Sequence, residues 1–143
     1  MVIYHAIKGV DEAGNPDQTS GELVRLIGKN CHTVTADNEL AERYSRHFKK
    51  LLSIPSLLYK TTEFLWEVIY NSSKFTLEAS PAPELPQGVR APRGDEYVLR
   101  AALISRPIVV SADKQVLREV NAQSMLGLRA VTPAEALELA KDT

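Results

Sequence analysis

This sequence has little of what marks a secreted or membrane-bound protein. Its single cysteine, Cys31, excludes an intramolecular disulfide framework, and we expect it to be a buried small hydrophobe. No apolar run is long enough to cross a bilayer, and no signal-peptide pattern opens the chain. We therefore expect a cytoplasmic protein with no membrane partner.

An excess of charge of one sign is also missing. The formal net charge is −1, so a polyanion would have to bind at a local basic patch or through bound cations. The glycine-rich phosphate loops GxGxxG and GxxxxGK[ST] are absent, and the three histidines show no metal-ligand spacing. These absences leave carboxylates as the main candidates for chemistry.

What the sequence does contain is an alternation of helical and strand-like segments. The 143 residues, 44% of them hydrophobic, suffice for one domain, 1–143, with a sizeable core. Residues 71–94, which hold four prolines, predict one long irregular loop. The expected strands are 1–7, 31–35, 108–111 and 128–131, and the expected helices begin near 19, 37, 56, 95, 114 and 133. This order predicts an α/β domain with a parallel sheet and helices on both faces.

Two aspartates lie on either side of the most apolar strand candidate. Asp95 heads one predicted helix, and Asp113 follows the strand in the motif IVVSAD. Ligands bind at the carboxyl ends of parallel strands, and two carboxylates there can hold a divalent metal through oxygen. The alternative is that both aspartates are helix N-caps, because Asp is a favoured capping residue.

The ordered motifs resemble those of PIN-domain proteins, in particular the toxin components of prokaryotic toxin–antitoxin pairs. The resemblance covers about residues 19–140 and rests on TSGELVRLI, HTVT, ADNELAERYSRHFKKLL, GDEYVLRAALISRPIVVSADKQVLREV and LGLRAVTPAEALELA. It implies a three-layer α/β/α fold with a central parallel sheet. It also implies a ribonuclease that uses Mg²⁺ or Mn²⁺, an antitoxin partner and a homodimer.

Carried over residue by residue, the resemblance places the catalytic and metal-binding acids at Glu42, Asp95 and Asp113. It adds Ser111 as the small hydroxyl residue that orients the acids or a water, and Glu96 as an adjacent acid able to assist. Metal ions held by such carboxylates neutralise the charge that builds on a phosphodiester during hydrolysis. Clustered carboxylates also raise one another's pKa, which a bound cation relieves.

Two arginines at the end of the proline-rich loop are candidates for RNA binding. Arg90 and Arg93 lie close to Asp95 in the sequence, where they could contact the phosphates of single-stranded RNA. Ordinary solvated arginines are the equally weighted alternative. The apolar helix around 64–69 is the candidate dimer surface, since its apolar residues cover more than one face.

The sequence departs from the PIN pattern at its start. Family members begin with a strand that ends in an aspartate, whereas this chain opens MVIYHAIKG and has no acid before Asp11. The first strand is therefore expected to be truncated or altered. Three hypotheses remain: a PIN-type ribonuclease, a catalytically degenerate PIN-like module that binds RNA or protein, and a small-ligand or signalling α/β domain.

Overall fold

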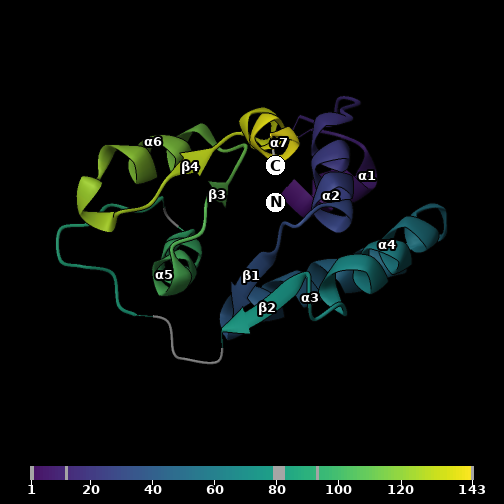
Figure 1. The fold of residues 1–143 in the computed structure, drawn as a ribbon, viewed down its shortest axis with the longest axis horizontal. Helices are drawn as coiled ribbons and strands as arrows, with labels where there is room; N and C mark the ends of the chain where they lie inside the picture. Colours follow the sequence, from purple (N-terminus) through teal and green to yellow (C-terminus); the bar gives the residue numbers. More distant parts are fainter. Residues whose placement is uncertain (1, 12, 79–82, 93, 143) are drawn as a thin grey trace.

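The computed structural model describes residues 2–11, 13–78, 83–92 and 94–142, and these form a mixed α/β structure that is mostly helical (Figure 1). The elements follow the order α1 (Val2–Lys8), α2 (Thr19–Lys29), β1 (Val34–Asp37), α3 (Asn38–Leu52), η1 (Pro55–Leu57), α4 (Leu58–Phe64), η2 (Leu65–Ile69), β2 (Phe75–Glu78), α5 (Glu96–Ser105), β3 (Val109–Val110), α6 (Lys114–Ala122), η3 (Ser124–Leu126), β4 (Ala130–Val131) and α7 (Pro133–Lys141).

Local sequence signals fix several helix boundaries. The Asp37 carboxylate accepts the Leu40 N–H at 2.8 Å and so caps α3, as the sequence predicts. The hydroxyl of Thr132 and the carboxylate of Glu135 form a capping box at the start of α7. Arg106 ends α5 in the left-handed conformation, directly before a proline. The predicted helices around these signals are therefore confirmed.

The prediction of a strand at 1–7 is wrong, because Val2–Lys8 forms the helix α1. Ile3 and Ile7 lie one helical turn apart, so the helix presents both to the same side. Ile7 is only 5% exposed and packs with Phe48 and Phe64, while Ile3 packs against the edge of that cluster. Tertiary packing of one apolar face thus outweighs the strand-like composition of the segment.

The middle of the chain needs two further corrections. Residues 75–78, expected to lie in an irregular loop, form β2, and β1 begins at Val34 rather than at Cys31. Cys31 is exposed, not buried. Just before β1, the side chains of Asn30 and His32 both contact the carbonyl oxygen of Ala140 at the end of the chain.

The strands pair in parallel, as predicted, but they form two separate sheets of two strands. The registers run from Val34↔Phe75 to Asp37↔Glu78 in the first sheet, and pair Val109↔Ala130 and Val110↔Val131 in the second. Within the described ranges no ladder joins β1 to β3, so the single central sheet that the sequence predicts is divided into two.

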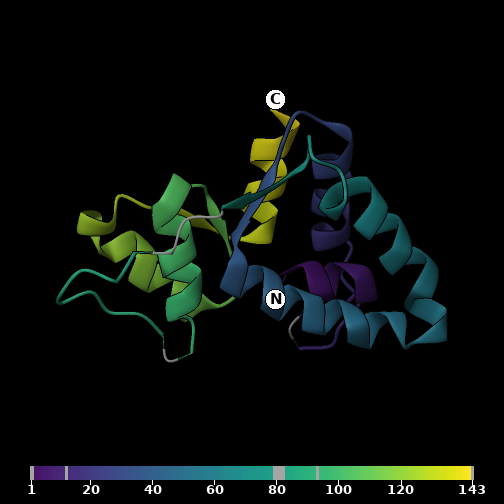
Figure 2. The ribbon, with the colours of Figure 1, turned by 90° about the horizontal axis from the view of Figure 1, so that it is seen from below.

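Each sheet belongs to one half of the molecule with its own core. We call residues 34–78 the β1–β2 half and residues 96–131 the β3–β4 half; they lie on opposite sides in Figures 1 and 2. Leu51 is fully buried in the first core, and Leu99 is fully buried in the second. A third cluster, formed by Leu23 of α2, Val131 of β4 and Leu137 of α7, packs against both Ile27 and Val110.

Two surface features bear on the earlier predictions. Trp66 and Tyr70 are 69% and 65% exposed and stack edge-on, so the surface predicted for a dimer does present aromatic side chains. Whether a second copy covers them stays a prediction. Across the described part of the chain, none of the helices is long and apolar enough to cross a membrane.

Candidate functional site

Asp95 and Asp113 begin neighbouring helices of the β3–β4 half, but only one of them is used as a cap. The Asp113 carboxylate accepts the Gln115 N–H at 2.8 Å and caps α6. Asp95 occupies the N-cap position of α5, after Gly94 in a left-handed conformation, yet its side chain forms no capping hydrogen bond. The capping interpretation therefore accounts for Asp113 and leaves the Asp95 carboxylate without that structural role.

The two carboxylates act on one another electrostatically. Partial burial raises the pKa of Asp95, and the negative charges of Asp113 and then Glu96 raise it further. A raised pKa means that the surroundings of Asp95 disfavour its ionised form. A cation bound between the two groups would remove that penalty, so the pair has the electrostatic character of a cation site.

The residues predicted to support the acids form local contacts. The Ser111 hydroxyl oxygen accepts the backbone N–H of Asp113 at 3.1 Å, so it fixes the turn that presents this carboxylate. The Glu96 carboxylate accepts the backbone N–H of Gly94 at 3.0 Å and closes the turn before α5. Ser111 thus orients one acid through the backbone, and Glu96 shapes the turn on which the other acid lies.

Glu42 lies away from this pair. Its carboxylate forms an ion pair with Arg46 at 2.7 Å, one helical turn along α3, and its side chain is 67% exposed. Among the residues that the structure describes, no group of three or more acidic, histidine or cysteine side chains could hold a metal ion. The structure brings Asp95 and Asp113 together and does not bring Glu42 to them.

Other residues of α3 face the start of α5 instead. Glu39 bonds to Arg100 of α5 at 3.2 Å, and the Arg43 guanidinium lies 3.9 Å from the centre of the Tyr97 ring. Burial and the neighbouring Asp95 charge raise the pKa of Tyr97. The sequence gives a weak signal for this group, because Glu39 and Arg43 have the i, i+4 spacing of an ion pair. Their partners on α5 are tertiary contacts that spacing does not reveal.

Of the two predicted RNA-binding arginines, the structure describes Arg90. Arg90 forms an ion pair with Glu119 of α6 at 3.3 Å and is otherwise 71% exposed. Its backbone is held by two hydrogen bonds with the side chain of Gln123. Arg93 lies outside the described residues. Arg90 is therefore anchored at the C-terminal end of α6 with a guanidinium that solvent can reach.

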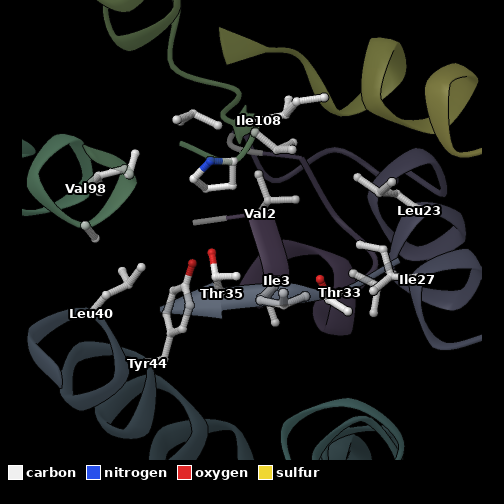
Figure 3. Close-up of a pocket in the computed structure, with 17 residues that line it drawn as sticks. Val2, Ile3, Leu23, Ile27, Thr33, Thr35, Leu40, Tyr44, Val98 and Ile108 are labelled. Carbon is white, nitrogen blue, oxygen red and sulfur yellow. The ribbon is translucent and has the colours of Figure 1, made fainter. Parts of the chain in front are cut away.

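A second feature near these acids is apolar. A cavity of about 210 Å³ opens between β1 and β3 and is lined from α1, α2, β1, α3, α5 and β3; we call it the slot (Figure 3). Tyr44 lies in its wall, and burial followed by the nearby Tyr97 raises the pKa of Tyr44 to about 12, so its hydroxyl stays neutral. The slot contains no carboxylate, so it is distinct from the Asp95–Asp113 pair.

The donors of the acidic pair suit magnesium better than a larger, many-ligand cation. Mg²⁺ is usually bound through one or two carboxylates, with water and substrate phosphates completing its shell. Asp95 offers a carboxylate that no cap uses, and Asp113 has one oxygen on Gln115 and a second that no capping bond takes. An aspartate whose pKa is raised by burial and by a neighbouring carboxylate fits such an ion. Comparison of the chain with protein-family models, with curated proteins and with solved structures finds no match.

Proposed function

We propose that this chain is a PIN-type ribonuclease whose site is centred on Asp95 and Asp113. The observation that carries the proposal is their arrangement: a carboxylate at the start of α5 that caps nothing and interacts electrostatically with the carboxylate that begins α6. A carboxylate with a raised pKa, such as that of Asp95, is typical of functional sites, since folding alone does not favour it.

In this proposal the side chains have separate roles. Asp95 and Asp113 would hold Mg²⁺ or Mn²⁺, which supplies charge neutralisation at the phosphate and a bound water of lowered pKa. Ser111 keeps Asp113 in position through its backbone N–H. The exposed guanidinium of Arg90 would contact a phosphate oxygen of the RNA while it stays beside the half-buried Glu119.

The proposal includes the PIN-like three-layer arrangement and its partners. In that arrangement the two half-sheets belong to one central parallel sheet, and α5 and α6 present the acids at its edge. An antitoxin that carries a basic side chain would neutralise the site by pairing with Asp95. A homodimer would use the exposed aromatic surface at Trp66 and Tyr70.

The test is cleavage of single-stranded RNA with Mg²⁺ or Mn²⁺ by the wild type, Asp95→Asn and Asp113→Asn. Asparagine removes the charge and retains the ability to cap α6, so loss of activity would report on the carboxylate rather than on folding. We expect each change to lower the rate about a hundredfold, because loss of a carboxylate ligand weakens binding of the metal ion that neutralises charge on the phosphate. Calorimetry should show that cation binding weakens in parallel.

Two further variants complete the assay. Glu138→Gln, at an exposed i, i+3 ion pair on α7, is the matched control and should leave cleavage unchanged. Glu42→Gln tests whether Glu42 is the third acid of the site. A loss of cleavage equal to that of Asp95→Asn would mean that Glu42 leaves Arg46 and joins the site. Cleavage that persists in both aspartate variants would refute the site.

A second candidate function is a catalytically degenerate PIN-like module that binds RNA or protein. It is favoured by a specific observation: Glu42 is paired with Arg46 on an exposed face, and the described residues contain no three-acid group. This candidate predicts RNA retention in a gel-shift assay without cleavage and without dependence on a divalent cation. The same wild-type sample therefore distinguishes the two functions.

A further inference from the structure

The slot between the two half-sheets has apolar walls. Val98 of α5, Ile108 beside β3, and Leu23 and Ile27 of α2 contribute side chains to it, and Figure 3 shows these around a common opening. An apolar cavity of about 150 Å³ accepts one benzene ring, so a cavity of about 210 Å³ has room for one or two apolar side chains. Its size and lining therefore suit apolar side chains rather than a charged ligand.

One wall of the slot is the free edge of β1. The Val34 N–H donates to the Lys74 carbonyl at 2.8 Å, so the backbone of Val34 faces β2. Backbone groups of successive residues in a strand point to opposite sides. The N–H and C=O groups of Thr33 and Thr35 therefore point away from β2, and both residues line the slot.

The opposite wall is the free edge of β3. The Val109 N–H donates to the Arg129 carbonyl at 2.9 Å, and the Ser111 N–H donates to the Val131 carbonyl at 3.0 Å. By the same alternation, the backbone groups of Ile108 and Val110 point away from β4. Both of these residues also line the slot.

Two unpaired strand edges thus border one apolar cavity. Across the described part of the chain, no backbone hydrogen bond pairs these outward-facing groups of Thr35 or Val110 with another element. Unpaired edges of this kind are templates for an added strand. An occupant that satisfies the slot must offer backbone donors and acceptors along both of its edges, together with apolar side chains.

We propose that the slot binds one extended apolar segment of a partner protein, which adds as a β-strand between β1 and β3. Only an extended polypeptide has free hydrogen-bonding groups along two edges, because a helix uses its own groups internally. Helix α1 of this chain already lines the slot through Val2 and Ile3, and its Ile7 is buried in the β1–β2 core. The inference is independent of the proposed ribonuclease function.

The first experiment measures binding of a defined probe, a fluorescent capped peptide of alternating valine and threonine flanked by a lysine at each end. We expect saturable one-to-one binding by anisotropy. Methylating the alternate backbone nitrogens of the same peptide should weaken binding about tenfold or more, because the side chains stay and the donors of one edge are lost.

Protein variants locate the binding. Ala101→Leu adds a side chain from α5 into the slot and should also weaken binding about tenfold or more, while Ala122→Leu, at an exposed end of α6, should bind as the wild type does. The circular dichroism and thermal midpoint of Ala101→Leu establish that it is folded. Filling a cavity is expected to preserve or raise stability.

Amide hydrogen exchange gives a residue-level readout with internal controls. Adding the peptide should slow exchange at the N–H groups of Thr35 and Val110, which face the slot. The N–H groups of Val34 and Val109 already bond to Lys74 and Arg129 and should change little.

Four results would overturn the proposal. Equal affinity for the methylated peptide would show that backbone pairing is not used. Equal affinity of Ala101→Leu, or no binding to the wild type, would show that the slot does not take a strand. A wild-type dimer that becomes monomeric in Ala101→Leu would assign the slot to a second copy of this chain instead of a partner protein.

Discussion

Each half of the molecule places an aspartate after a strand and uses it to begin the next helix, but the two aspartates are in different surroundings. Asp37 ends β1 and is only 5% exposed, and its carboxylate accepts a backbone hydrogen bond that caps α3. Asp113 follows β3, caps α6 from a less buried position, and has Asp95 close enough to raise the pKa of that neighbour. The same residue type is therefore structural in the first half, whereas in the second it belongs to an acidic pair that folding alone does not explain.

The cores of the two halves give the largest expected effect. Leu51 and Leu99 are both fully buried, each in a different cluster, so replacing either with alanine should cost about 2–5 kcal/mol of unfolding free energy. Because the clusters share no member, the double variant should equal the sum within about 0.5 kcal/mol. Urea denaturation measures the unfolding free energy of the two single variants and the double variant. A double-variant loss that differs from the sum by more than about 1 kcal/mol would mean that the halves share one core.

The two caps should differ by a smaller amount. Asp37→Ala should cost about 1–2 kcal/mol, since it leaves the Leu40 N–H without its partner at a buried site, and Asp113→Ala should cost about 0.5–1 kcal/mol. The matched controls Asp37→Asn and Asp113→Asn retain a capping oxygen and should lose less. Equal losses for the two alanine variants in the same denaturation assay would remove the distinction between the two sites.

The acidic pair should give the smallest effect, with a sign that depends on pH. The pKa of Asp95 is raised in the folded state, so the native protein retains a proton that the unfolded chain releases. Wild-type stability should therefore fall as pH rises through the window between the ordinary pKa of aspartate, about 3.9, and the raised value. Asp95→Asn should be more stable than the wild type at pH 7, by less than about 0.5 kcal/mol for this partly exposed group, and equal to it at pH 3.

Thermal melts at the two pH values measure this difference, and Mg²⁺ sharpens it. If the pair binds the cation, adding it at pH 7 should raise the melting temperature of the wild type and leave that of Asp95→Asn unchanged. An Asp95→Asn variant that is less stable than the wild type at pH 7 would mean that the carboxylate has a structural partner after all.

The sequence alone determined the features that depend on near neighbours along the chain. The N-caps at Asp37 and Asp113 and the capping box at Thr132 follow from hydrogen bonds between residues no more than a few positions apart. The parallel pairing of the strands follows from the alternation of helices and strands. The nearness of Asp95 and Asp113 was also foreseeable, because each begins a helix beside the same strand.

Tertiary structure decided what depends on faces and partners far apart in sequence. It made 2–8 a helix because Ile7 could be buried against Phe48 and Phe64, and it turned part of the proline-rich segment into β2 beside β1. It also set which face of α3 meets α5, so that Glu39 and Arg43 contact that helix and Glu42 turns to Arg46. Local hydrogen bonds are encoded by spacing, whereas the choice of which face is buried depends on the whole of the packed chain.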